Sequence, residues 1–322
     1  MGPDRTEAIG MSDSSNEPTT EHARDGPDAT NTAGARGAGS LTTSAAAEST
    51  TRKPVPDGGP QVGAVEGKPD TVLRVDDLQK SFGGLTATDH ATFEVERGTI
   101  TGLIGPNGAG KSTLFNLISG FYDPDGGSVT VNGTDVTGLE PYQVADHGLI
   151  RTFQTPRKLE GMTVREAMLV GPRNQPGESF ITLFTSPSTV AESEAANLAE
   201  AERILGEFEI DHLATQPATD ISGGQMKLVE LARAMLADPE VLLLDEPVAG
   251  VNPTLAKKLK TQIRRLHREG TTFVLIEHDM EFVMDLADPI IVLDQGSVLT
   301  EGTPEAVRND ERVISAYLGG GA

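Results

Sequence analysis

The chain has 322 residues, with 37% hydrophobic residues, 4% aromatic residues and no cysteine. The absence of cysteine excludes a disulfide-stapled fold, a zinc–cysteine site, an iron–sulfur cluster and a cysteine nucleophile. The formal net charge is −22, from 48 acidic residues against 26 Lys and Arg residues, and it disfavours nucleic-acid binding, which normally needs a basic surface. An acidic excess with only 9 Lys beside 17 Arg resembles that of proteins in molar salt, so the composition is open to two interpretations, a halophilic protein and an ordinary acidic protein.

The apolar runs of the chain are short. Runs such as 241–244 and 273–276 are the longest that occur, whereas a membrane-spanning helix needs about 20 apolar residues. The chain is therefore expected not to cross a membrane by itself.

Residues 1–70 are rich in Gly, Ala, Ser, Thr, Pro, Asp and Glu and contain almost no large apolar residues. Because this segment shows neither helical nor alternating periodicity and cannot bury a core, the sequence predicts a disordered acidic low-complexity tail. Ordered structure is expected over residues 71–322.

From residue 71 onward, short β-branched or apolar runs alternate with helical periodicity. This pattern predicts an α/β fold with a largely parallel sheet. The expected strands are residues 72–75, 91–95, 100–104, 128–131, 149–153, 241–244, 272–276, 290–293 and 297–301.

Residues 160–239 are expected to form a mostly helical subdomain. A stretch rich in Gly, Pro and Ser at 171–188 predicts a surface loop, and the following residues 191–208 predict a helix.

A further helix is predicted at 254–268, and its ends carry clear signals. Asn252 can cap this helix, Pro253 suits its first position and Gly270 can end it.

A glycine-rich loop follows the predicted strand at 100–104 and precedes a helix that ends near Ser119. A phosphate chain needs close backbone N–H groups, a helix N-terminus, a cation for the terminal phosphates and a hydroxyl for Mg²⁺. The glycines, Lys111 and Ser112 supply these groups, so the sequence predicts a P-loop. Its expected nucleotide-binding residues are Gly105, Pro106, Asn107, Gly108, Ala109, Gly110, Lys111, Ser112 and Thr113.

Two acids, Asp245 and Glu246, follow the predicted buried strand at 241–244. By themselves, two acids at a strand end are more often a solvated turn. After a P-loop, however, the first acid is placed to coordinate Mg²⁺. The second is then placed to polarise the water that attacks the γ-phosphate.

The sequence Ser222-Gly223-Gly224-Gln225 is open to two interpretations. Ser222 followed by Gln225 is a capping box for an apolar-periodic helix. Two consecutive glycines in the first turn weaken such a helix by about 1 kcal/mol each relative to alanine. Their benefit would be exposed N–H groups that bind phosphate, and this cost without a local return favours a functional role.

The order of these motifs, with a glutamine after a strand and a later Glu-His-Asp sequence, resembles that of the ATP-binding subunit of an ABC transporter. The resemblance covers about residues 71–322. It implies an ABC nucleotide-binding domain of the P-loop NTPase class, with a RecA-like core, an antiparallel β subdomain and a helical subdomain. It also implies that the nucleotide is ATP, bound with Mg²⁺.

The resemblance implies a role for several single residues. Phe82 lies where an aromatic side chain stacks on adenine, and Gln154 lies where a glutamine senses Mg²⁺ and the membrane partner. His278 lies where a histidine contacts the γ-phosphate. The implied catalytic residues are Glu246, His278 and Gln154, and the implied metal ligands are Ser112, Gln154 and Asp245.

A working site is implied to need two chains. Residues Ser222, Gly223, Gly224 and Gln225 form the signature that closes on the ATP of a second subunit, and residues 249–252 form the loop that contacts this subunit. Ile221 stands where Leu is usual before the signature, a change that conserves volume and is expected to be harmless. Asn252 stands where many relatives have Asp, which leaves a charged contact across the dimer in doubt.

Further short sequences resemble the branched-chain amino-acid type of importer. The resemblance implies an ATPase at the cytoplasmic face of the membrane that serves separate permease subunits, a second ATPase subunit and, indirectly, an extracellular solute-binding protein. Related members serve urea and short amides, so that substrate class stays open, as do a non-transport ABC ATPase and a nucleotide-dependent regulator. The sequences are Phe82-Gly-Gly-Leu, Gly120-Phe-Tyr-Asp-Pro, Arg151-Thr-Phe-Gln, Met162-Thr-Val, Ile276-Glu-His-Asp-Met, Gly302-Thr-Pro-Glu and Ala316-Tyr-Leu-Gly.

Overall fold

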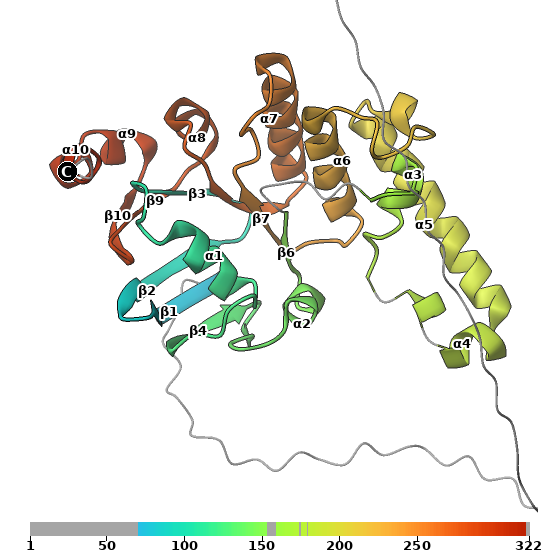
Figure 1. Cartoon of the computed structure of the whole chain (residues 1–322), viewed down its shortest axis with the longest axis horizontal. Helices are drawn as coiled ribbons and strands as arrows, with labels where there is room; N and C mark the ends of the chain where they lie inside the picture. The colour runs from blue at the N-terminus through green and yellow to red at the C-terminus, as the bar shows by residue number, and fades with distance from the viewer. Residues whose placement is uncertain (1–69, 153–158, 174, 179, 320–322) are drawn as a thin grey trace, which may run out of the picture. The chain divides into compact units, whose positions relative to one another are not determined.

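The computed structural model of the chain describes residues 70–152, 159–173, 175–178 and 180–319 (Figure 1). The predicted tail therefore lies, apart from Asp70, outside the described residues. The part of the chain that the structure describes has no helix that is both long and apolar enough to span a membrane.

A six-stranded sheet has the strand order β10-β9-β3-β8-β7-β6. Five strands run parallel, and only β10 pairs in the antiparallel sense, with β9. Every residue of β3, β7 and β8 is buried, as expected for continuous apolar strands that are covered on both faces. The strands are β3 (Ile100–Ile104), β6 (Leu149–Arg151), β7 (Val241–Asp245), β8 (Thr272–Ile276), β9 (Ile290–Asp294) and β10 (Ser297–Gly302).

A second sheet has four antiparallel strands in the order β2-β1-β4-β5. Strands β1 and β2 have 12 residues each and are much longer than expected. They extend because they pair along polar, exposed ends, which hydrophobic patterning does not reveal. The strands are β1 (Thr71–Phe82), β2 (Leu85–Glu96), β4 (Gly126–Val131) and β5 (Thr134–Asp135), of which β5 was not expected.

The strands are connected by short and long helices. Among the described residues these are α1 (Lys111–Ile118), α2 (Pro141–Asp146), α3 (Val164–Met168), α4 (Phe180–Thr185), α5 (Pro187–Glu207), α6 (Gly223–Met235), α7 (Pro253–Arg268), α8 (Met280–Leu286), α9 (Pro304–Arg308) and α10 (Glu311–Gly319), with 3-10 turns η1 (Pro176–Glu178) and η2 (Asp211–Leu213).

Two hydrophobic clusters lie on opposite faces of the six-stranded sheet. On one face, Leu243 of β7 belongs to the same cluster as Phe115 of α1 and Val75 of the antiparallel sheet. Helix α1 therefore lies between the two sheets (Figure 1). On the other face, Leu242 packs with residues of α3, α5, α6, α7 and α8, such as Leu228. The α/β fold predicted from the sequence is therefore confirmed, with its parallel strands, its antiparallel sheet and its group of helices.

The surface loop predicted at 171–188 is wrong in part, because this segment contains η1 and α4, and α5 begins at Pro187. The Gly, Pro and Ser content suggested a loop, but local bonds close helical turns here. Ser186 N donates to Thr182 O at 2.9 Å, and Thr185 Oγ1 donates to Ile181 O at 2.8 Å. Proline also suits the first position of a helix, as in α5.

The helix predicted at 254–268 is confirmed as α7. Asn252 Oδ1 accepts a hydrogen bond from Leu255 N at 3.0 Å, and Pro253 takes the first helical position. Gly270, just after the helix, has a φ of 106°, which a glycine adopts without strain.

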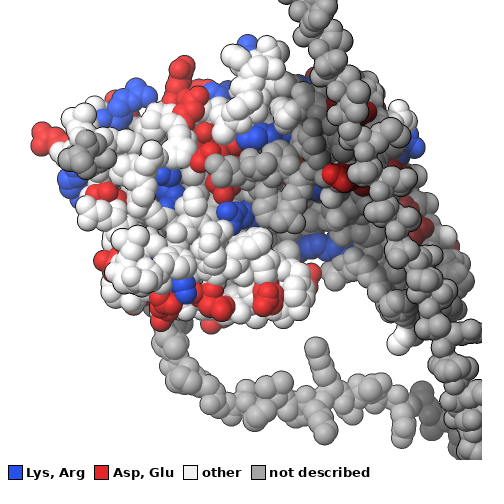
Figure 2. All heavy atoms as spheres, viewed as in Figure 1, with Lys and Arg blue, Asp and Glu red and all other residues white. Residues whose placement is uncertain are grey.

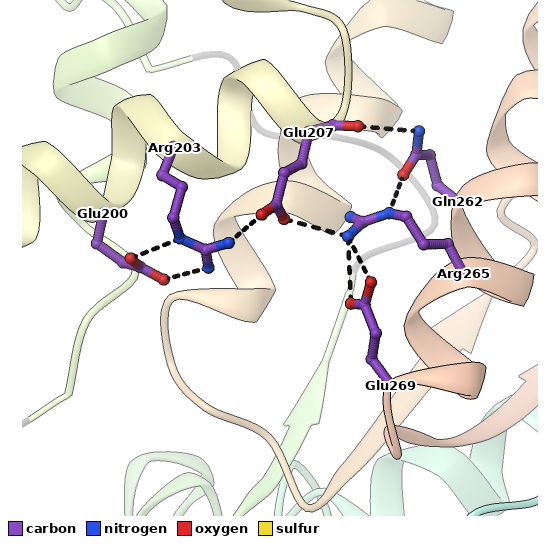
Figure 3. A network of polar contacts seen from close by, with 6 residues as sticks. All are labelled: Glu200, Arg203, Glu207, Gln262, Arg265 and Glu269. Carbon is purple, nitrogen blue, oxygen red and sulfur yellow. Dashed lines mark hydrogen bonds and ion pairs between the residues drawn. The ribbon is translucent and has the colours of Figure 1, made fainter.

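Ion pairs connect the C-terminal end of α5 to α7 (Figure 3). Arg265 Nη1 lies 3.1 Å from Glu207 Oε2 and 3.0 Å from Glu269 Oε1. Arg265 Nε donates to Gln262 Oε1 at 2.9 Å, and Glu207 also pairs with Arg203 of its own helix. One guanidinium is therefore shared by two carboxylates from different helices.

We expect Arg265→Met to lower the free energy of unfolding by about 1 kcal/mol, because the two carboxylates lose their shared cation while an apolar side chain still covers Phe208. The loss should shrink in molar KCl, which screens these charges. Urea denaturation at low and high KCl measures both effects. Arg268→Met, on an exposed part of the same helix, is the control, and equal losses in both variants would contradict the expectation.

Candidate functional site

The glycine loop between β3 and α1 has a backbone that larger residues cannot adopt. Gly105, Gly108 and Gly110 have φ values of 156°, 80° and 96°. A Cβ on Gly105 would lie 2.2 Å from Leu293 O, and a Cβ on Gly110 would lie 2.2 Å from Ala87 O. No atom of the described residues lies within 4 Å of a Cβ built on Gly108, so within that part of the chain the loop has room for a ligand here.

Lys111 is the first residue of α1, and its side chain folds back over the glycine loop. Its Nζ donates to Gly105 O at 2.8 Å and to Pro106 O at 3.0 Å. Burial lowers the pKa of Lys111, and the nearby Glu246 carboxylate opposes this shift. The loop therefore holds an ammonium group beside the exposed Ser112, the next residue of the helix.

The acids predicted after β7 lie at the edge of the sheet where β7 and β8 end. Asp245 is buried, and Glu246 has a φ of 48°, in the left-handed region. Glu246 N donates to Ile276 O at 2.9 Å, which joins this turn to the end of β8. Glu246 Oε1 lies 2.9 Å from His278 Nε2, so the structure brings together two of the three residues to which the resemblance attributes catalysis.

Asp245 forms an ion pair that sequence reasoning missed. Its Oδ2 lies 2.8 Å from Nη2 of Arg151, the last residue of β6. Arg151 was noted only as part of a sequence typical of importers. A charged residue at the end of a covered strand was a possible signal for its role.

Glu277 and Lys227 were also missed. Glu277 is 4% exposed, and its Oε1 accepts a hydrogen bond from Val248 N at 2.7 Å, while its Oε2 accepts one from His278 N at 3.2 Å. Burial raises the pKa of the Glu277 carboxyl. Lys227 Nζ donates to Glu246 O at 2.6 Å. These two residues fix the loops that carry Glu246 and His278.

The capping box at the start of α6 is confirmed. Ser222 Oγ accepts a hydrogen bond from Gln225 N at 3.3 Å, and Gln225 Oε1 accepts one from Ser222 N at 2.9 Å. A Cβ on Gly224 would lie 2.6 Å from Leu255 Cδ1 and 3.3 Å from Val251 Cγ1, so these side chains would have to shift to admit a larger residue. Among the described residues nothing lies within 4 Å of a Cβ on Gly223, and phosphate binding stays a prediction for both glycines.

The helix that follows the P-loop and the helix that follows the signature belong to different parts of the fold. Phe115 of α1 lies in the cluster on one face of the six-stranded sheet, and Leu228 of α6 lies in the cluster on the other face.

Phe82 and Gln154 are the remaining predicted site residues. Phe82, at the end of β1, is 43% exposed and packs edge-on against Tyr122 with ring centroids 5.4 Å apart. Its ring is thus accessible to a ligand. Gln154 lies outside the described residues, as does Phe153, the last residue of the strand predicted at 149–153.

Comparison with known proteins assigns the family. The sequence model described as "ABC transporter" matches residues 88–249. The chain belongs to this family. As an ABC transporter ATP-binding subunit it binds ATP and hydrolyses it. A second model, described as "Branched-chain amino acid ATP-binding cassette transporter", matches residues 297–322 of this subunit.

The ABC subunit is similar to several curated proteins over most of their length. It is 41% identical over 249 residues to the probable branched-chain amino acid transport ATP-binding protein LivG of Archaeoglobus fulgidus, with 77% of this chain and 95% of LivG covered. It is 40% identical over 250 residues to the high-affinity protein BraF of Pseudomonas aeruginosa, with 77% and 98% covered.

Solved structures agree with the assignment of the fold. A nucleotide-free ATP-binding cassette from an ABC transporter superposes with a TM-score of 0.67 at 38% sequence identity, covering 76% of this chain and 98% of that one. A cassette in its ADP conformation superposes with the same TM-score and identity, covering 77% and 99%.

The donor set near the P-loop fits Mg²⁺. The Ser112 hydroxyl and the Asp245 carboxylate are hard oxygen donors. Ser112 lies in α1, after the glycine loop that follows β3, and Asp245 is the last residue of β7, so both come at the ends of parallel strands of one sheet. Mg²⁺ at nucleotide sites is typically held by one or two such protein groups together with phosphates and waters. Two protein donors at this edge therefore suffice.

Proposed function

We propose that this chain is the ATP-hydrolysing subunit of a membrane importer for branched-chain or related amino acids. The observation that carries the proposal is the match of residues 297–322 to the family named for branched-chain amino acid transporters. Relatives at about 40% identity are named as branched-chain amino acid transport ATP-binding proteins. The chain would act at the cytoplasmic face of the membrane and drive separate permease subunits, with a solute-binding protein outside.

Each residue of the proposed site has its own role. Lys111 and the glycine-loop amides bind the phosphates, and Ser112 and Asp245 hold Mg²⁺, which neutralises phosphate charge. Glu246 accepts a proton from the attacking water. His278 lies 2.9 Å from the Glu246 carboxylate and orients this carboxylate beside the γ-phosphate. Phe82 stacks on adenine, and Gln154 links the site to the permease.

The complete site is proposed to form between two chains, either two copies or this chain and a paralogue. Each chain has one P-loop and one signature, and packing on opposite faces of the sheet supports a signature that serves another subunit. The open surface at Gly223 suits approach to phosphate.

The permease is proposed to dock on a groove between α2 and the helices that follow β6. This groove has a volume of about 380 Å³ and is lined by residues that include Arg151 and Thr152, just before the expected position of Gln154. Its rim exposes 68% of Tyr142 and 56% of Val170. Exposed apolar side chains such as Val170 around polar lining residues such as Arg151 suit a protein interface.

Transport in proteoliposomes tests the proposal. The chain is reconstituted with permease and solute-binding proteins of its source organism, in low and in multimolar KCl. We expect ATP-dependent uptake of labelled leucine, isoleucine and valine, with the highest rate in multimolar KCl because the acidic surface needs screening. Uptake of urea or acetamide instead would contradict the amino-acid assignment. Nucleotide binding without uptake of any of these solutes would contradict the transport role.

A further inference from the structure

The side chain of Arg151 joins three segments that serve the nucleotide site. Its Nη1 donates to Asn116 Oδ1 at 2.6 Å and to Ser119 Oγ at 3.1 Å, at the end of the helix that follows the P-loop. Its Nη2 donates to Asp245 Oδ2 at 2.8 Å, at the end of β7. Arg151 itself ends β6, three residues before Gln154.

The contacts of Arg151 require a planar guanidinium. The side chain is 11% exposed, and its Cζ lies 5.7 Å from the ring centre of Phe115 and 5.6 Å from that of Phe121. A guanidinium can point several donors at acceptors in its plane while its faces meet aromatic rings. A lysine ammonium has no such plane and cannot reproduce the set of contacts.

The ion pair fixes the orientation of the Asp245 carboxylate. The Asp245 side chain is 6% exposed, and the pair engages its Oδ2, so that Oδ1 lies outside this pair. The pair also bridges two neighbouring strands, because β6 and β7 pair in parallel with Arg151 opposite Leu243. Carboxylates that bind metals are commonly held in this way by a second group, whose loss weakens metal binding or activity by about 10- to 100-fold.

We propose that Arg151 is a positioning residue for Asp245, which orients the carboxylate and so sets how strongly the site binds Mg²⁺ with nucleotide. This inference rests on the proposed function, in which Asp245 is a metal ligand. Arg151 acts through Asp245 and has no contact with the nucleotide in this role.

The test is a binding measurement that does not depend on turnover. The affinity of the full chain for a non-hydrolysable ATP analogue is measured by calorimetry with Mg²⁺ and with EDTA. The dissociation constant in EDTA divided by the dissociation constant with Mg²⁺ is the ratio that reports how much the metal strengthens binding. We expect Arg151→Gln to lower this ratio about ten-fold, while affinity in EDTA stays close to that of the unchanged chain.

Three further variants separate the possible outcomes. Arg268→Gln removes an exposed arginine of α7 whose described hydrogen bond is to the backbone oxygen of Arg264, and it should leave the ratio unchanged. Asp245→Asn should lower the ratio, and adding Arg151→Gln to it should lower the ratio no further, since Arg151 acts through Asp245.

The two assignments fail in different ways. If Asp245→Asn leaves the ratio unchanged, the proposed metal ligand is wrong. If Asp245→Asn lowers the ratio but Arg151→Gln does not, only the positioning role of Arg151 is overturned. Circular dichroism checks folding, and if Arg151→Gln does not fold, Arg151→Lys takes its place. Arg151→Lys keeps the charge but not the planar contacts, and a ratio equal to that of the unchanged chain in this variant overturns the proposal.

Discussion

Glu246→Gln is expected to lower the rate of ATP hydrolysis by about 10²- to 10⁴-fold while ATP binding is retained. Glutamine has the shape of glutamate but cannot accept the proton of the attacking water. The carboxylate of Glu246 lies 2.9 Å from His278 Nε2, and its backbone is fixed to β8 and to Lys227. The substitution should therefore change the chemistry and leave the loop in place.

Hydrolysis and assembly are measured together for this variant. Phosphate release gives the rate, and light scattering after gel filtration in ATP gives the mass. Because ATP is proposed to lie between two chains, a variant that binds ATP without hydrolysing it should accumulate as an ATP-bound dimer. Glu281→Gln removes an exposed acid from the first turn of α8 and should hydrolyse ATP normally. Equal rates in the Glu246 variant and the unchanged chain would refute its role.

Lys111→Met is expected to weaken nucleotide binding by about 100-fold. The Lys111 ammonium is held by Gly105 O and Pro106 O, inside the loop that is proposed to receive the phosphates. Methionine keeps the apolar stem but removes the charge. Two charge-assisted hydrogen bonds at about 1.5–3 kcal/mol each correspond to at least this factor, at about 1.4 kcal/mol per ten-fold.

Equilibrium binding of a fluorescent ATP analogue measures the loss. Lys257→Met, which removes an exposed lysine from α7, should bind normally and shows whether loss of any positive charge is enough. Thermal unfolding of both variants reports whether the glycine loop has kept its structure. Unchanged affinity in a folded Lys111→Met protein would mean that the phosphates bind elsewhere.

The contact between Glu246 and His278 illustrates which features of the site can be predicted from the sequence. The sequence predicted that each residue follows a buried strand, and the resemblance implied a role for each. It did not predict that β7 and β8 are neighbours, since strand order is set by packing across the whole sheet. The roles of both residues stay predictions, whereas their contact at 2.9 Å is observed.

The two glycines after Ser222 show a different limit. Their sequence pattern is identical for packing and for phosphate binding, so the pattern could not separate the two explanations. The side chain of Leu255, on another helix, occupies the space beside Gly224, while the space beside Gly223 is open. Tertiary packing thus gives the two glycines different surroundings, while a role in phosphate binding stays a prediction for both.

The sequence by itself determined the α/β class, the glycine loop before α1, and the caps of α6 and α7. These features depend on periodicity and on hydrogen bonds between residues three or four positions apart, so they are visible in a short stretch of chain. Only the tertiary structure decided that Arg151 holds Asp245, 94 residues away. That contact exists because β6 pairs with β7, and no local pattern encodes the pairing of segments so far apart.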